Sequence, residues 1–300
     1  MTLNTGQSNH DSHDRLLHVS RFESVRKLTM PKQLLPSLID AHVHTDDDRF
    51  ENILDEVLSK ARIANVVAQI VPSICARRWP NVKSVCARHN ELFACYGLHP
   101  CFQAEHTAQH IEDLATWIGR EKPVALGECG LDYFIENADK PFQQQLFAAQ
   151  LALAREFNLP IVIHARRAVD DVIELIKSAD HHKGMIHSFN GSAQQAKRLI
   201  DLGYKLSFGG AVSYNRATKL RAMLAGLPLD AILLETDAPD QPDATHTGQL
   251  NQPGYLPDVL AAISVIRSED ARVIAKATTK NAIDLFGLPT KVLAKKKNTI

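Results

Sequence analysis

The chain has 300 residues, and its 34 basic and 34 acidic side chains cancel. The strongly basic surface that is typical of many nucleic-acid-binding proteins is therefore absent, although a cleft or a bound metal ion could supply positive charge locally. The 5 cysteines have irregular spacing, and no apolar run reaches the ~18 residues of a membrane-spanning helix, so we expect a protein of the reducing cytoplasm without membrane segments.

The two ends of the chain differ from its middle. Residues 1–35 are polar and show little periodicity, which predicts a flexible N-terminal extension, and translation could begin at Met30 as well as at Met1. Residues 290–300 have the composition of a basic C-terminal tail. We expect residues 36–289 to form a single domain.

Short apolar segments alternate with helix-like segments throughout this domain. The predicted strands are residues 37–43, 65–71, 92–98, 124–130, 160–165, 184–189, 204–210 and 231–237. Most are apolar on both faces, as parallel strands covered by helices are. Residues 142–157 have apolar side chains at helical spacing, and a second predicted helix begins after Ser192, a suitable N-cap, and ends at Gly203. This alternation predicts the α/β class and a (β/α)8 TIM barrel.

Histidines and carboxylates recur where these strands end. Since the strand ends of such a barrel meet at one mouth, we expect six side chains to converge there: His42, His44, Glu128, His164, His187 and Asp237. Four imidazoles and two carboxylates are too many for one tetrahedral zinc ion, but they suit two divalent ions bridged by a carboxylate such as Glu128. Zinc and manganese suit nitrogen ligands, whereas magnesium prefers oxygen. Each residue could instead be an ordinary core or turn residue, which would require six separate coincidences.

Several segments also occur in a recognisable order between about Leu38 and Pro289: DAHVHTD, GLHP, ALGECGLDY, PIVIHAR, HSFNGS and LLETDAPD. They resemble the motif series of the TatD family of metal-dependent hydrolases, which are (β/α)8 barrels of the amidohydrolase-like superfamily and are best described as metal-dependent DNases.

The resemblance also implies a role for each residue of the cluster. His42, His44 and Asp237 would hold one metal ion, His164 and His187 would hold the second, and Glu128 would bridge them. Asp237 would also orient the attacking water and accept its proton. His99 in GLHP would contact the phosphate or the leaving group, and Arg166 in PIVIHAR is a candidate for substrate binding.

Two positions depart from the family pattern and bear on the substrate. Cys101 follows GLHP where a further histidine is common, and Asp240 follows ETDAP where a large side chain is common. A carboxylate at the mouth would repel a polyanion unless the metal ions, or Arg166 and Arg167, offset it. Three aromatic residues near strand ends could stack bases or could simply pack the loops: Phe102, Tyr133 and Phe134.

The leading hypothesis is therefore metal-dependent cleavage of phosphodiester bonds, as a 3′–5′ exodeoxyribonuclease acting on single-stranded DNA. The alternative is an amidohydrolase or esterase acting on a small molecule or an aminoacyl substrate. Many such barrels bridge their metal ions with a modified lysine on the fourth strand, and Glu128 at that place favours the nuclease. A non-catalytic barrel that binds a partner ranks last, because all six ligand positions are filled. Nothing in the sequence indicates an obligate protein partner.

Overall fold

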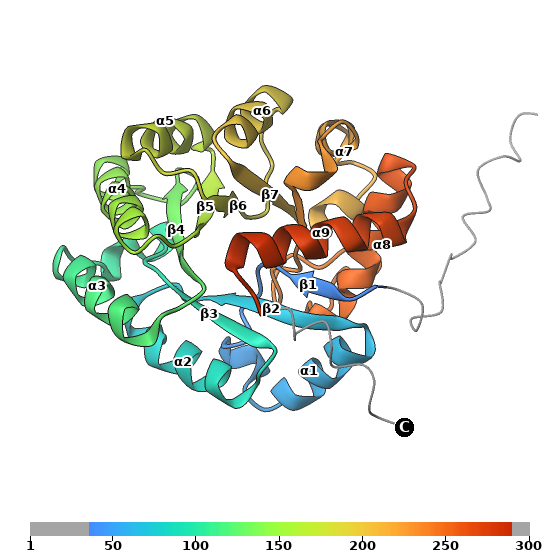
Figure 1. Ribbon diagram of the computed structural model, residues 1–300, viewed down its shortest axis with the longest axis horizontal. Helices are drawn as coiled ribbons and strands as arrows, with labels where there is room; N and C mark the ends of the chain where they lie inside the picture. Colours follow the sequence, from blue (N-terminus) through green and yellow to red (C-terminus); the bar gives the residue numbers. More distant parts are fainter. Residues whose placement is uncertain (1–35, 290–300) are drawn as a thin grey trace, which may run out of the picture.

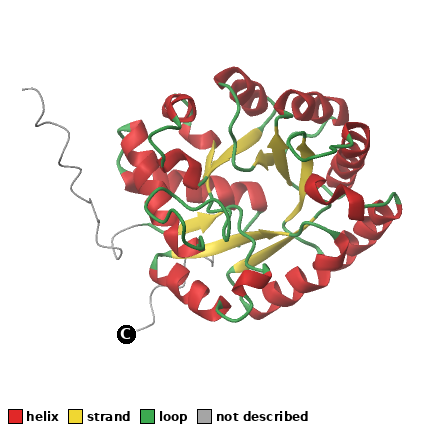
Figure 2. Ribbon diagram, turned by 180° about the vertical axis from the view of Figure 1, so that it is seen from behind, coloured by secondary structure: helices red, strands yellow, loops and turns green. Residues whose placement is uncertain are grey.

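Eight parallel strands form one sheet in the computed structural model, which describes residues 36–289. They are β1 (Leu38–Asp40), β2 (Val66–Pro72), β3 (Leu92–Tyr96), β4 (Ala125–Asp132), β5 (Ile161–Arg166), β6 (Gly184–Ile186), β7 (Tyr204–Phe208) and β8 (Ile232–Leu234). Each strand pairs in parallel with the next. The backbone N–H of Ala41 donates to the carbonyl of Leu234 at 2.9 Å, so the first and last strands meet and the sheet nearly closes (Figure 2). The predicted (β/α)8 barrel is confirmed.

Helices surround this sheet on the outside (Figure 1). They are α1 (Leu54–Ile63), α2 (Trp79–Arg88), α3 (Gln109–Glu121), α4 (Lys140–Glu156), α5 (Val169–Ala179), α6 (Ala193–Asp201), α7 (Thr218–Ala225), α8 (Leu256–Arg267) and α9 (Ala271–Phe286). As predicted, α6 begins after Ser192, whose side chain forms a capping box with Gln195. Within the described residues, no helix is long and apolar enough to cross a membrane. The expectations for residues 1–35, including a start at Met30, and for residues 290–300 lie outside the described part.

The barrel is filled by apolar side chains and sealed at one end. Ile70 and Met185 belong to a buried cluster inside the sheet, which Leu285 and Phe286 of α9 complete. The hydroxyl of Thr279 on α9 donates to the carbonyl of Ser37, directly before β1, at 2.6 Å. Helix α9 therefore lies across the end at which the strands begin, and the opposite end remains for a functional site.

Five strands are shorter than predicted: β1, β3, β6, β7 and β8. β1, β6 and β8 have three residues each, so several predicted site residues follow a strand rather than ending it. The side chain of Asp40 explains the early end of β1 and β8, because its carboxyl oxygens accept the backbone N–H and the hydroxyl of Thr236 at 3.0 and 2.6 Å. A side-chain carboxyl group thus replaces a backbone partner at the seam of the barrel. Hydrophobic pattern alone does not reveal such a substitution.

Candidate metal centre

Two histidines that follow β1 lie beside Asp237 at the open end of the barrel. The Nε2 atoms of His42 and His44 are 3.2 Å apart, and they lie 3.4 and 3.7 Å from Oδ1 of Asp237. The same two nitrogens lie 3.2 and 3.6 Å from Oε2 of Glu128. Four ligands about 2.1 Å from a tetrahedral ion would be about 3.4 Å from one another, so this group could hold a metal ion.

A second pair of histidines faces the other oxygen of Glu128. Nδ1 of His164 and Nε2 of His187 are 3.2 Å apart, and they lie 3.2 and 3.1 Å from Oε1 of Glu128. Glu128 therefore directs one carboxylate oxygen toward each histidine pair. The six side chains that the sequence singled out lie together in the structure.

Hydrogen bonds elsewhere on two of the rings determine which nitrogen carries the proton. Nδ1 of His44 lies 3.2 Å from the carbonyl of Pro72, and Nε2 of His164 lies 2.8 Å from a carboxylate oxygen of Asp132. Both oxygens can only accept, so the protons reside on those nitrogens. The lone pairs of His44 Nε2 and His164 Nδ1 consequently point at Glu128, and two facing acceptors require a proton or a cation between them. The donor set therefore fits a metal centre.

A break in the sheet aims Glu128 into the mouth. The pairing of β4 with β5 shifts register between Leu126 and Cys129, which leaves Glu128 outside the regular ladder. Gly127 has a φ of +142°, and a Cβ on it would lie 2.6 Å from the carbonyl oxygen of Val162. Only glycine fits this close approach, so the GE pair is a local requirement for placing the carboxylate.

The surrounding imidazoles keep Glu128 ionised although its side chain is 2 % exposed. Burial alone would raise the pKa of Glu128, but its interactions with the rings of His99, His187 and His42 hold it well below its usual range. Burial alone would lower the pKa of His187, and the charge of Glu128 raises it well above the usual value. Metal ions that bind such ligands displace protons from them.

His99 also reaches this carboxylate, but with the ring nitrogen that carries its proton. Its Nε2 lies 2.9 Å from Oε1 of Glu128, and its Nδ1 accepts the backbone N–H of Cys101 at 3.0 Å. The proton therefore resides on Nε2, which donates into the site. Burial lowers the pKa of His99 to about 4, so the ring is neutral at pH 7. Such a ring suits a hydrogen bond to a substrate oxygen better than metal binding.

Sequence reasoning missed two buried carboxylates behind the histidines. Asp132 orients His164, as described above, and also accepts the backbone N–H of Phe134 at 2.8 Å. Burial would raise the pKa of Asp132, but these hydrogen bonds hold it below its usual value. Glu235 accepts the backbone N–H of Ser188 at 2.6 Å, beside the ring of His187. Asp132 lies in the segment ALGECGLDY and Glu235 in LLETDAPD. Both carboxylates are therefore visible in the sequence, but only the structure shows that they lie beside the histidines.

A third missed residue, Gln241, holds Asp237. Its side-chain amide donates to Oδ2 of Asp237 and accepts the hydroxyl proton of Ser188, with an oxygen–oxygen distance of 3.0 Å. Because Oδ1 of Asp237 faces the first histidine pair, the two carboxylate oxygens have different partners. Gln241 thereby fixes the rotation of the Asp237 carboxylate.

Asp240, expected to repel a polyanion, is paired with a residue that the sequence did not indicate. Both of its oxygens accept from the guanidinium of Arg49 at 2.8 Å. Arg166 and Arg167 lie elsewhere, over the exposed ring of Phe134, with their guanidinium carbons 3.8 and 4.4 Å from the ring centroid. Arg49 therefore offsets part of the charge of Asp240, because its guanidinium also donates to the carboxylate of Asp47 at 2.8 and 2.9 Å.

Comparisons with known proteins agree with this geometry. Residues 39–287 match the family model described as TatD related DNase. The metal-dependent hydrolase YjjV of Escherichia coli K12 is 39% identical over 254 residues, which cover 84% of this chain and 98% of YjjV. The metal-dependent hydrolase YabD of Bacillus subtilis 168 is 32% identical over 251 residues, which cover 83% of this chain and 98% of YabD.

Solved structures show the same fold. The crystal structure of YjjV superposes with a TM-score of 0.82 at 38% identity, covering 84% of this chain and 98% of that one. A TatD family hydrolase from Entamoeba histolytica gives 0.74 at 19% identity, over 84% of this chain and 98% of that one, a likeness of fold alone. The chain therefore belongs to the TatD-related DNase family of metal-dependent hydrolases.

Proposed function

We propose that this protein hydrolyses phosphodiester bonds in DNA with two divalent metal ions, one at each histidine pair. The supporting observation is that the two oxygens of Glu128 face separate pairs of imidazole nitrogens. His42, His44 and Asp237 would hold the first ion, and His164 and His187 would hold the second. Glu128 would bridge the two.

The ions, when bound, would activate water and neutralise the charge of a scissile phosphate. Asp237 accepts a proton from the attacking water, because Gln241 holds its Oδ2 and leaves Oδ1 toward the site. The water oxygen bonds to phosphorus while the bond to the leaving sugar oxygen breaks, and that oxygen takes a proton from solvent water. His99 donates its Nε2–H to a phosphate oxygen and stays neutral, as its lowered pKa requires. Arg166, exposed beside His164, binds the phosphate of a neighbouring nucleotide.

We further propose a single-stranded substrate that is degraded from its 3′ end. Glu128 and His187 are 2 % and 6 % exposed, so the site lies below the rim of the barrel. The end of a flexible strand reaches such a recess more easily than a duplex does. The family description as DNases supports the choice of nucleic acid over other phosphodiesters.

End-labelled single-stranded DNA tests this proposal. Purified protein is incubated with manganese, magnesium or zinc, with an EDTA control and with Asp237→Asn. We expect a metal-dependent ladder, shortened from the 3′ end, that the variant does not produce. A ladder from the 5′ end would reverse the polarity. Protein that holds two ions and cuts no DNA, but hydrolyses esters or aminoacyl compounds, would instead establish the amidohydrolase alternative.

A further inference from the structure

The hollow over the candidate metal centre continues past it. Three adjoining hollows of about 400, 430 and 550 Å³ lie along the mouth, and Gln241 lines all three. His164 and His187 line the first and second, and Asn190 lines the second and third. The three therefore form one groove, which runs from the metal centre to the loop between β7 and α7.

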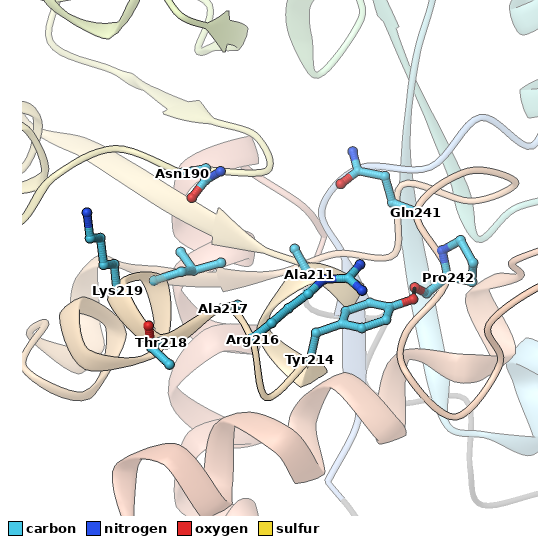
Figure 3. A pocket seen from close by; sticks show the side chains of 10 residues that line it. Asn190, Ala211, Tyr214, Arg216, Ala217, Thr218, Lys219, Gln241 and Pro242 are labelled. Carbon is cyan, nitrogen blue, oxygen red and sulfur yellow. Dashed lines mark hydrogen bonds between the residues drawn. The ribbon is translucent and has the colours of Figure 1, made fainter.

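We call the far part of this groove, lined by Asn190, Tyr214, Arg216, Lys219 and Gln241, the β7 groove (Figure 3). Asn190 and Gln241 lie across it from Tyr214 and Arg216. Its volume of about 550 Å³ is in the range of ligand-binding pockets. Four of its ten lining residues are apolar, but both of its charged residues, Arg216 and Lys219, are cationic, which favours an anionic ligand.

The charges at the two ends of the groove differ. At the end nearest α1 and α2, the three arginines are already bound to carboxylates: Arg49 to Asp240, Arg77 to Glu105 and Arg78 to Asp48. Asp46 and Asp47 line the hollow there as well. Arg49 is also paired with Asp47, and Arg78 with Asp46, so a polyanion entering from this side would meet five carboxylates and three arginines.

The β7 groove carries positive charge that no carboxylate offsets. Arg216 and Lys219 are exposed, and across residues 36–289 neither forms an ion pair. The guanidinium of Arg216 lies over the ring of Tyr214, 4.6 Å from its centroid, which keeps the planar group in place. The hydroxyl of Tyr214 in turn donates to the carbonyl of Pro242 at 2.9 Å. A guanidinium held in this way is suited to a phosphate, with which it can form two parallel hydrogen bonds.

We propose that the β7 groove binds the phosphate backbone of a single-stranded oligonucleotide whose scissile phosphate lies at the metal centre. Arg216 and Lys219 bind phosphates beyond the scissile one, and Asn190 and Gln241 line the path between. This inference rests on the proposed function and narrows it: the substrate is a strand of several nucleotides rather than a mononucleotide or a small ester.

The test is the affinity of the full-length protein for dye-labelled oligo(dT), measured by fluorescence anisotropy in EDTA, where metal-dependent cleavage does not occur. Arg216→Ala/Lys219→Ala is compared with Lys183→Ala/Lys276→Ala, which removes two exposed lysines on other parts of the surface. Each phosphate contact to a single strand contributes about 0.7 to the slope of log affinity against log salt. Loss of two contacts should reduce that slope by about 1.4 and weaken binding about 25-fold in 0.1 M salt.

The expected result is this loss for a ten-nucleotide strand, a smaller loss for a dinucleotide, and wild-type binding by the control variant. Equal binding by both double variants, or no binding by the wild-type protein, would overturn the β7 groove as a strand site. DNA cleavage is assayed in parallel with manganese. If binding depends on Arg216 and Lys219 but no DNA is cleaved, the β7 groove is supported as a strand site and the proposed function is rejected. If DNA is cleaved but binding does not depend on these two residues, the proposed function is supported and the β7 groove is rejected.

Discussion

Replacing Asp132 by asparagine should disable one of the two proposed metal positions without changing the size of any side chain. Oδ1 of Asp132 accepts the backbone N–H of Phe134 at 2.8 Å, and Oδ2 lies 2.8 Å from Nε2 of His164. An asparagine must keep its oxygen toward the backbone N–H, so its amide N–H₂ would face His164. A donor at that place requires a lone pair on Nε2 and moves the ring proton to Nδ1, which then faces Glu128 and cannot bind a cation.

The loss of metal affinity should be large for one ion and small for the other. Partners that orient metal-binding histidines typically contribute 10- to 100-fold to metal affinity, which is about 1.4 to 2.8 kcal/mol. Because the asparagine imposes the wrong tautomer, we expect the upper end of this range, about 100-fold, for the ion at His164 and His187. Asp132→Ala imposes no tautomer on His164, so it should weaken binding of the same ion only about 10-fold. The ion at His42 and His44 should be nearly unaffected.

Isothermal titration of the metal-free protein with zinc or manganese resolves the two affinities. Asp139→Asn is the matched control, since this exposed residue caps α4 and asparagine caps a helix equally well. Two unchanged affinities in Asp132→Asn, or a larger loss in Asp132→Ala than in Asp132→Asn, would refute the tautomer argument.

Three further predictions concern the seam and the rim of the barrel. Burial raises the pKa of Asp40 to about 8, whereas its pKa in the unfolded chain is near 4. The folded state therefore keeps a proton that the unfolded chain releases, so the contribution of Asp40 to the free energy of unfolding is full below about pH 4 and is lost as the pH rises through about 8. Asp40→Asn should therefore flatten the fall of the unfolding free energy between pH 5 and 8, by up to about 1.4 kcal/mol per pH unit in urea titrations; an unchanged slope would contradict this. Gln241→Leu should lower kcat about 10-fold, because the Asp237 carboxylate would lose the hydrogen bond that fixes its rotation. A kcat equal to that of the wild-type protein would show that Gln241 does not position Asp237. Arg49→Ala should raise KM for DNA about 2- to 5-fold by exposing Asp240, and Arg49→Ala/Asp240→Ala should restore it; failure to restore would show that Arg49 acts otherwise.

Much of the site could be predicted because its residues occupy a repeated position. His42 and Asp237 follow the ends of β1 and β8, and Glu128 and His164 lie within β4 and β5. A parallel barrel brings those places together regardless of loop conformation. The regular alternation of apolar strands and amphipathic helices therefore determined both the fold and the cluster. Strand lengths were less predictable, since the carboxylate of Asp40 ends the pairing at the seam.

The residues that hold the ligands could not be predicted in the same way. Arg49 and Asp240 are 191 positions apart, and Ser188 and Gln241 are 53 apart, so their contacts depend on how separate loops fold over the mouth. No local periodicity encodes such a contact. Asp132 is different, because it lies on β4 four positions after Glu128 and was visible in the sequence, but only the structure shows that it faces His164.

The most direct measurement of the central claim, that Glu128 joins two metal sites, is metal content by mass spectrometry after equilibrium dialysis. We predict two ions per chain in the wild-type protein, one in His44→Ala, one in His164→Ala, and a loss at both sites in Glu128→Ala. Asp139→Asn again serves as the control and should keep two. If the wild-type protein holds a single ion, and either histidine variant loses it, then Glu128 does not join two metal sites.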